Sequence, residues 1–227
     1  MRSPHAETIA RFQRKLLTWY GKHGRDLPWR RTRDPYRVLV SEVMLQQTQV
    51  DRVVPKYHEF LARYPTWRDL AQAPAADVKR TWRPLGYNIR PVRLQAIARE
   101  TLKRYDGRLP DDARALRSMR GIGPYTAGAV MSFAYGRDVP ILDTNVRRVI
   151  ARVFLSARRV ARIRGDRPYW ELAGALVPRG RGYDFNQALM DFGATWCTAR
   201  RPRCASCTMR SLCLTFEATR GKSGQAR

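Results

Sequence analysis

Residues 116–127 read LRSMRGIGPYTA, and this short segment indicates how the chain folds. An apolar helical pattern ends near Met119, two glycines permit a tight turn, and a second helix can begin at Pro124. Gly121 and Gly123 would let backbone N–H groups approach a phosphate, and the new helix N-terminus adds partial positive charge. The segment predicts a helix–hairpin–helix that grips a DNA backbone without reading its sequence, although an ordinary corner between two helices has the same pattern.

Helical periodicity extends outward from this segment over most of the chain. Apolar side chains recur at spacings of three and four residues, and no convincing alternating strand or Asn-Gly hairpin is present. The predicted helices cover residues 7–20, 38–53, 56–64, 93–105, 125–135, 145–154 and 185–196. We therefore predict an all-α fold.

The predicted helices divide into two lobes. A helical bundle domain of residues 25–136 would contain the helix–hairpin–helix at 116–127. Residues 1–24 would join residues 137–216, which contain all four cysteines, to form the second lobe. Residues 217–227 have the composition of a frayed tail.

The charge balance indicates the partner. The chain carries 44 Lys and Arg residues against 19 Asp and Glu residues, which gives a formal net charge of +25, and 38 of the basic residues are Arg. Such an excess repels itself unless a polyanion neutralises it, and nucleic acid is the obvious polyanion. A GC-rich coding bias could supply many arginines but would not explain so few acids. A membrane surface is disfavoured because no helix is basic on one face and strongly apolar on the other.

Length and composition limit the class of protein. With 227 residues, 44% of them hydrophobic, the chain can bury a core, which excludes a wholly disordered protein. No apolar run approaches the roughly 18 residues that a membrane helix needs, and the polar first ten residues do not resemble a signal peptide. We expect a soluble monomer in the cytoplasm, associated with the nucleoid if the source is bacterial, and no membrane partner.

Four cysteines, Cys197, Cys204, Cys207 and Cys213, lie within 17 residues at the spacing C-x6-C-x2-C-x5-C. Disulfides are disfavoured without a secretory signal, and four thiolates this close would repel one another unless a metal neutralised them. Zinc and a [4Fe–4S] cluster can both take four cysteine ligands. Zinc sites usually pair two short C-x2-C hooks, whereas one is present here, so the wide spacing fits the larger cluster better. Spacing alone leaves zinc as a competitor.

An acidic residue follows the hairpin. Residues 141–146 read ILDTNV, which places Asp143 twenty residues after Gly123, between an apolar run and a predicted helix. In a purely structural interpretation, Asp143 or Thr144 caps the helix that begins near Asn145. The hairpin before it and the cysteines after it instead favour a functional carboxylate.

The hairpin, the acid twenty residues later and the cysteine spacing together resemble the helix–hairpin–helix DNA glycosylases that carry an iron–sulfur cluster. Within that group, SEVMLQQTQV at residues 41–50 resembles the signature of the MutY adenine glycosylases. Further matching strings are PWR at 28–30, LGY at 85–87, GPYTAGA at 123–129 and FNQALMD at 185–191. The resemblance runs from about Arg25 to Cys213, which is nearly the whole chain.

The resemblance implies a base-excision-repair enzyme that flips a mispaired base out of DNA and hydrolyses its N-glycosidic bond. Glu42 would protonate the leaving purine and help to activate water, and Asp143 would stabilise the positive charge on the sugar. Asn145 would orient Asp143. Tyr125 stands where bifunctional relatives such as endonuclease III carry a Schiff-base lysine, so we expect a monofunctional glycosylase with weak or no strand cleavage.

The resemblance also implies how the duplex is held. Gln47 and Tyr87 would wedge into the base stack as the base leaves. The hairpin residues Gly121, Gly123 and Thr126 would contact the DNA backbone.

The expected partner is double-stranded DNA containing a mismatch or an oxidised base, and the expected cofactor is a [4Fe–4S] cluster on the four cysteines. Arg200 and Arg201 lie in a basic loop between the first two cysteines. That loop could clamp a phosphate, or it could simply be solvated.

The sequence leaves the identity of the excised base undecided. MutY enzymes usually carry a C-terminal domain that reads 8-oxoguanine, whereas only fourteen residues follow Cys213, so we expect that domain to be missing. MutY enzymes also usually have Gly at the Thr144 position and a second Tyr at the Asn88 position. A related branch excises thymine or uracil from T·G and U·G mismatches, lacks the extra domain and has Tyr at the Tyr125 position. The string at 41–50 favours adenine opposite guanine or 8-oxoguanine, and the missing domain favours thymine or uracil.

Two other hypotheses fit the same residues. The first is a non-catalytic DNA-binding module with a structural or redox cluster, in which Asp143 only caps a helix. The second is a nucleic-acid-binding protein stapled by zinc.

Overall fold

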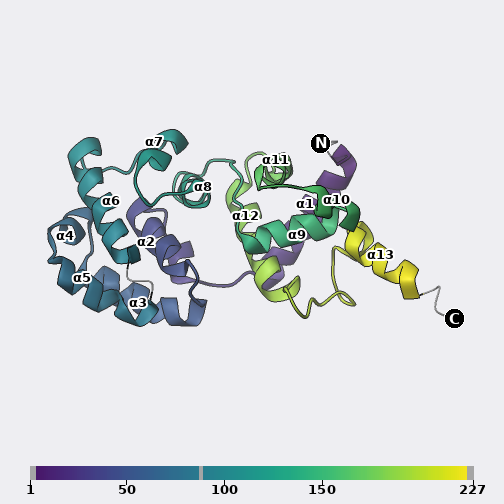
Figure 1. Ribbon diagram of the computed structural model, residues 1–227, viewed down its shortest axis with the longest axis horizontal. Helices are drawn as coiled ribbons and strands as arrows, with labels where there is room; N and C mark the ends of the chain where they lie inside the picture. The colour runs from purple at the N-terminus through teal and green to yellow at the C-terminus, as the bar shows by residue number, and fades with distance from the viewer. Residues whose placement is uncertain (1–3, 87–88, 224–227) are drawn as a thin grey trace. The chain divides into compact units, whose positions relative to one another are not determined.

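The computed structural model describes residues 4–86 and 89–223, and every regular element within these ranges is a helix (Figure 1). The all-α class predicted from the sequence is confirmed. The chain forms two compact units, one of residues Asp26–Gly136 and one that joins the residues before Asp26 to those from Arg137 onward. We call the first the bundle unit and the second the cysteine unit. Within the described ranges, none of the helices combines the length and apolar character needed to traverse a bilayer.

The bundle unit is built around helix α2. Its elements are η1 (Pro28–Arg30), α2 (Pro35–Leu45), α3 (Val50–Arg63), α4 (Trp67–Gln72), α5 (Ala75–Trp82), η2 (Arg83–Leu85), α6 (Ile89–Tyr105), α7 (Ala113–Ser118) and α8 (Pro124–Phe133). Helix α2 packs on α3, α6 and α8, and α4 packs on α6. The core includes the fully buried side chains of Tyr36, Leu39, Phe60 and Trp82. Burial of an apolar side chain of this size contributes about 1.5–3 kcal/mol, and α2 supplies Tyr36 and Leu39 to this core.

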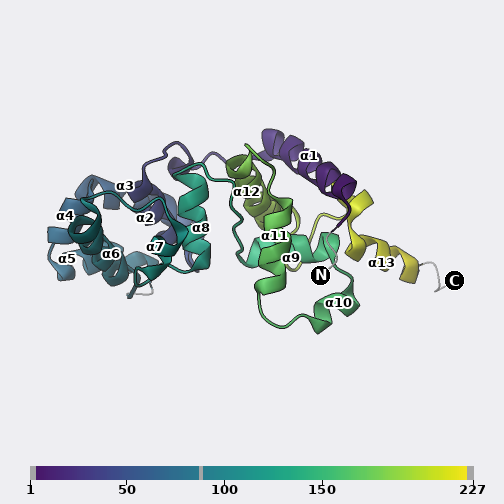
Figure 2. The ribbon, with the colours of Figure 1, turned by 90° about the horizontal axis from the view of Figure 1, so that it is seen from above.

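The cysteine unit packs both ends of the described chain together. Its elements are α1 (Ala6–His23), α9 (Thr144–Phe154), α10 (Ala157–Arg162), α11 (Arg167–Leu176), α12 (Gly182–Asp191), the π-helical turn η3 (Phe192–Trp196), η4 (Arg210–Leu212) and α13 (Leu214–Ser223). Helix α1 lies along α12, as Figure 2 shows. The Phe12 ring lies 4.9 Å from the Phe154 ring and 6.2 Å from the Phe185 ring between centroids, so this aromatic cluster joins α1, α9 and α12.

One predicted helix, over residues 38–53, is wrong. Helix α2 ends at Leu45 and α3 begins at Val50, with an irregular turn between them. Gln47 takes a left-handed conformation with φ of 55°, which no helix interior accepts. The Arg90 side chain also bonds the carbonyl oxygens of Val43 and Met44, which a continuing helix would need for its own amides. The apolar periodicity could not reveal this break because both helices bury apolar residues.

The first part of the predicted frayed tail is helical. Helix α13 covers Leu214–Ser223, while residues 224–227 lie outside the described residues. The Glu217 amide bonds the Cys213 carbonyl oxygen at 3.1 Å, so the helix begins beside the last cysteine. Contacts between α13 and α9 stabilise it, because most helical stability in proteins comes from such packing.

Candidate functional site

Glu42 lies deep within the bundle unit. Asp34 caps the start of α2 by accepting a hydrogen bond from the Tyr36 amide at 2.9 Å, and Pro35 occupies the first helical position. Residues Val38 to Met44 are all buried, and Glu42 is only 3% exposed. Carboxylates are seldom buried to this extent without a specific reason, so Glu42 is not an ordinary surface residue.

The loop after α2 presents Gln47. Its side chain is exposed, while its backbone is left-handed. That conformation is uncommon and costly for a residue other than glycine, and such strain concentrates at functional sites. Tyr87, the other predicted wedge residue, and Asn88 lie outside the described residues.

The predicted hairpin is formed by α7, the five-residue turn of residues 119–123 that includes both glycines, and α8. Gly121 has φ of 107°, and a Cβ atom there would lie 3.2 Å from Arg93 Cβ, so glycine is required. A Cβ atom at Gly123 would have no neighbour within 4 Å. Gly123 therefore leaves open space beside the backbone, which a phosphate could enter.

The N-terminus of α8 offers backbone donors. The first intrahelical bond runs from the Ala127 amide to the Gly123 carbonyl oxygen at 2.9 Å. The amides of Tyr125 and Thr126 precede it and have no carbonyl partner within the helix. Thr126 as a whole is only 3% exposed, so its hydroxyl is not presented at the surface of the hairpin.

Asp143 occupies the N-cap of α9 in the cysteine unit. Its Oδ1 accepts a hydrogen bond from the Val146 amide at 2.6 Å, and its Oδ2 accepts one from Asn145 Nδ2 at 3.0 Å. The two bonds fix the plane of the carboxylate. The capping role foreseen from the sequence is therefore present, and Asn145 contacts the carboxylate directly.

The structure adds Arg148, which the sequence did not single out. Its Nη2 donates to Asn145 Oδ1 at 2.8 Å and to the Gly193 carbonyl oxygen at 2.6 Å, and its Nε donates to the Cys197 carbonyl oxygen at 2.9 Å. Burial lowers the pKa of its guanidinium from the usual value. Arg148 follows Asn145 by three positions, which places both on one face of a helix, but 38 arginines gave no reason to choose this one.

The four cysteines surround one cavity of about 250 Å³ in the cysteine unit. Arg152 closes one side: its Nη1 lies 3.5 Å from Cys197 Sγ and donates to the Thr198 carbonyl oxygen at 2.7 Å. Burial raises the pKa of the Cys207 thiol to about 11 and that of Cys213 in the same direction. Thiols in such surroundings need a cation to exist as thiolates.

The donor set is chemically suited to a metal centre. Four cysteine thiols line one cavity, and both zinc and a [4Fe–4S] cluster take four cysteine thiolates as ligands.

The loop between the first two cysteines is basic and accessible. Arg200, Arg201 and Arg203 are all exposed. The Arg203 guanidinium lies 5.1 Å from the Trp196 ring centroid, which anchors the loop at its base.

The site residues are shared between the units. Glu42, Gln47 and the hairpin belong to the bundle unit, whereas Asp143, Asn145 and the cysteines belong to the cysteine unit.

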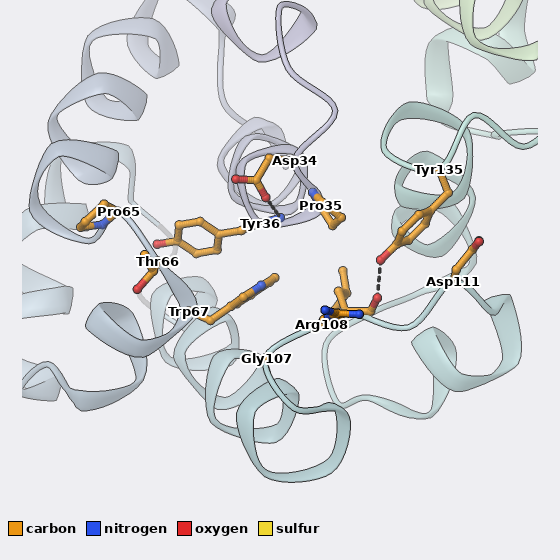
Figure 3. Close-up of a pocket in the computed structure, with 11 residues that line it drawn as sticks. Asp34, Pro35, Tyr36, Pro65, Thr66, Trp67, Gly107, Arg108, Asp111 and Tyr135 are labelled. Carbon is orange, nitrogen blue, oxygen red and sulfur yellow. Dashed lines mark hydrogen bonds between the residues drawn. The ribbon is translucent and has the colours of Figure 1, made fainter.

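A further cavity of about 550 Å³ contains none of the predicted site residues (Figure 3). Tyr36, Trp67 and Tyr135 form its walls. Tyr36 donates its hydroxyl to the Tyr64 carbonyl oxygen at 2.5 Å, and Tyr135 donates to the Leu109 carbonyl oxygen.

Comparisons with known proteins show which family the chain belongs to. Residues 40–167 match the HhH-GPD superfamily, described as base excision DNA repair proteins. The chain is 42% identical over 214 residues to the adenine DNA glycosylase of Homo sapiens, a match that covers 90% of this chain but only 39% of the human protein. It is 37% identical over 219 residues to the thymine/uracil-DNA glycosylase of Pyrobaculum aerophilum, covering 94% of this chain and 95% of that one. A solved structure of a thermostable thymine-DNA glycosylase matches with a TM-score of 0.88 and 35% identity, over 93% of this chain and 98% of that chain.

Proposed function

Because the chain belongs to the HhH-GPD superfamily of base excision DNA repair proteins, we propose that it is a monofunctional DNA glycosylase that acts on a mispaired base in double-stranded DNA. The observation that carries the proposal is the Asp143 carboxylate, which the Val146 amide and the Asn145 carboxamide hold in one orientation. A fixed anion of this kind stabilises positive charge that develops in a transition state without having to reorganise.

The proposed reaction is hydrolysis. As the bond between C1′ of the sugar and the base nitrogen breaks, its electron pair leaves with the base, and Glu42 supplies a proton to a ring nitrogen of the leaving base. Asp143 stabilises the sugar cation, and a water oxygen adds to C1′ while its proton returns to Glu42. The products are a free base and an abasic site. Tyr125 offers no amine, so no imine forms and the strand stays intact.

Adenine is the base we propose. Residues 41–50 read SEVMLQQTQV and include Glu42, the proposed acid. That string is the part of the chain that resembles the MutY signature, and identity to the human adenine DNA glycosylase reaches 42%. A purine leaving group also suits the chemistry, because a purine ring nitrogen accepts the proton that makes it a good leaving group.

Thymine or uracil is the second candidate, and a specific observation favours it. The chain is 37% identical to the Pyrobaculum aerophilum thymine/uracil-DNA glycosylase over 219 residues, and the solved structure of a thermostable thymine-DNA glycosylase matches it with a TM-score of 0.88. Thr144, which directly follows Asp143, also departs from the glycine usual in MutY enzymes.

We also propose that Cys197, Cys204, Cys207 and Cys213 hold a [4Fe–4S] cluster. The cavity that all four cysteines line supports a shared metal centre, and the C-x6-C-x2-C-x5-C spacing, with a single C-x2-C pair, favours the cluster over zinc. Bound there, the cluster would fix the basic loop of Arg200 and Arg201 relative to α9, and we assign it no step in the hydrolysis.

Four duplexes decide the substrate. The chain would be incubated with A·8-oxoguanine, A·G, T·G and U·G pairs, and alkali would then cut the strand at any abasic site. We expect cleavage of the two adenine substrates after alkali and little cleavage without it. Cleavage of T·G without A·G would transfer the assignment to thymine and uracil. Tight, salt-sensitive binding with no base released from any duplex would favour the non-catalytic DNA-binding module.

A further inference from the structure

Arg90 is a cation buried at the start of α6 in the bundle unit. The residue is 4% exposed, and its guanidinium carbon lies 5.5 Å from the centroid of the Trp82 ring. Arginine is seldom buried to this extent unless its donors are used. Its two Nη atoms donate hydrogen bonds to the end of α2, to the loop after α2 and to the end of η2.

The first segment is the C-terminal end of α2. Arg90 Nη1 donates to the carbonyl oxygens of Val43 at 3.1 Å and Met44 at 2.9 Å, and also to that of Gln46. The last carbonyls of a helix have no amide partners of their own and carry partial negative charge. Arg90 therefore caps α2 with a full positive charge.

The second set of contacts goes to the loop between α2 and α3 and to the end of η2. Arg90 Nη2 donates to Thr48 Oγ1 at 3.1 Å and to the carbonyl oxygens of Leu85 at 3.0 Å and Gly86 at 3.2 Å. The planar guanidinium fork can hold several acceptors in fixed directions, which a lysine ammonium cannot do. One side chain thus joins the α2–α3 loop to the end of η2.

Gln47 lies between the two residues of that loop to which Arg90 donates hydrogen bonds. Arg90 contacts Gln46 immediately before it and Thr48 immediately after it. Gln47 has the strained left-handed backbone, and its side chain is exposed. A conformation of this kind persists only where its surroundings over-determine it, and the Arg90 contacts on both sides do so.

We infer that Arg90 is a positioning residue for base extrusion, because it holds Gln47 in the strained conformation from which the glutamine enters the base stack. The inference rests on the proposed function, since Gln47 acts as a wedge only if a base leaves the duplex. Arg90 orders the loop before DNA arrives, so the binding energy of the duplex is not used to order it.

The test compares Arg90→Met with Gln95→Met. Gln95 lies on the same helix, is 3% exposed, and donates to the carbonyl oxygens of Leu70 at 3.0 Å and Ala73 at 2.7 Å, away from the Gln47 loop. Both variants lose buried hydrogen bonds, so both lose stability. Hydrogen exchange without DNA should rise about tenfold in residues 43–50 for Arg90→Met, and not for Gln95→Met.

Excision rates supply the second readout. The target base would be offered either paired in a mismatch or already unpaired in a bulge, at a temperature where each variant is folded. Arg90→Met should lose about tenfold on the paired substrate and much less on the bulge, because the bulge removes the extrusion step. Gln95→Met should lose equally on both. If Arg90→Met does not fold, Arg90→Lys replaces it in both measurements. Its hydrogen exchange and excision rates should lie between those of the wild type and those expected for Arg90→Met.

The outcomes separate the two proposals. The role of Arg90 would be overturned if Arg90→Met left hydrogen exchange in residues 43–50 unchanged, or if it lowered the excision rate equally on paired and bulged substrates. Neither result would affect the proposed function, provided that the wild-type chain releases the base. A wild-type chain that releases no base from either substrate would overturn the proposed function and the inference together.

Discussion

The Nε atom of Arg148 lies 2.9 Å from the carbonyl oxygen of Cys197, so the residue that binds Asn145 also binds the first cysteine. Asn145 in turn bonds Asp143 at 3.0 Å. A chain of hydrogen bonds therefore runs from the proposed catalytic carboxylate to the backbone of the cysteine cluster. Gly193 permits this arrangement, because a Cβ atom there would come within 2.8 Å of Asn145 Cβ.

Arg148→Met should slow excision more than it weakens DNA binding. Methionine cannot donate to Asn145, so the carboxamide is free to rotate and Asp143 loses one of its two fixed partners. A misplacement of this size costs about 10- to 100-fold in rate, measured under single-turnover conditions. The matched control is Arg152→Met, which breaks bonds to the cysteine loop without touching Asn145. Equal rate losses at equal metal content would mean that Arg148 acts only through that loop.

Asp143→Asn should separate catalysis from capping. Asparagine caps helices about as well as aspartate, so the free energy of unfolding should change by less than about 1 kcal/mol. Excision should fall by at least about 10²-fold because the anion is gone, while binding persists. Asp112→Asn makes the same change at the N-cap of α7, where Asp112 accepts from the Ala115 amide at 2.7 Å, and should leave excision unaltered. Full activity of Asp143→Asn would reduce Asp143 to a helix cap.

The N-cap position of Asp143 was predictable because its signal is local, whereas its catalytic role stays a prediction. An acid between an apolar run and a helical pattern is a recognisable N-cap, and the structure places it there. The hairpin was predictable for the same reason, since a left-handed Gly121 and a proline at the start of α8 leave marks in the sequence. The position of a helix N-cap or of a tight turn is set by residues close by in the sequence, so the sequence pattern alone can reveal it.

Arg90 and Arg148 could not be predicted because their roles depend on residues far away in the sequence. Arg90 bonds carbonyl oxygens more than 40 positions earlier, and Arg148 bonds Cys197, 49 positions later. Backbone carbonyls carry no side-chain signature, so nothing in the sequence marks the partner. The sequence did not predict the break after α2 for the same reason, because the side chain that helps to end this helix belongs to the distant residue Arg90.

Alkaline pH should destabilise the bundle unit through Tyr57. Burial raises the pKa of its hydroxyl to about 12 from the usual value near 10. Below about pH 10 the hydroxyl is neutral in both folded and unfolded chains, and its contribution to stability is complete. Between about pH 10 and 12 only the unfolded chain ionises, so the free energy of unfolding should fall by about 1.4 kcal/mol per pH unit at most. Urea unfolding at several pH values would measure the slope.

Tyr57→Phe provides the control for this slope. Phenylalanine keeps a ring at the position that packs 5.4 Å from the Trp29 ring but has no proton to lose. Its stability should decline less steeply over the same pH range. A slope identical to that of the wild type would show that Tyr57 does not contribute to alkaline unfolding.

Metal analysis should distinguish a cluster from zinc at the four cysteines. A [4Fe–4S] cluster gives a brown protein with equal amounts of iron and acid-labile sulfide, whereas zinc gives a colourless protein. Cys204→Ser should lower the iron content and destabilise the cysteine unit, because the cluster loses one of the four ligands by which it would join the cysteine loop to the rest of the unit. The bundle unit has its own core and should keep its stability. Ser206 is one of the two residues between Cys204 and Cys207, and the control variant Ser206→Ala should leave the metal content unchanged. One zinc ion per chain in the purified wild type would refute the cluster while leaving the hydrolytic assignment of Asp143 untouched.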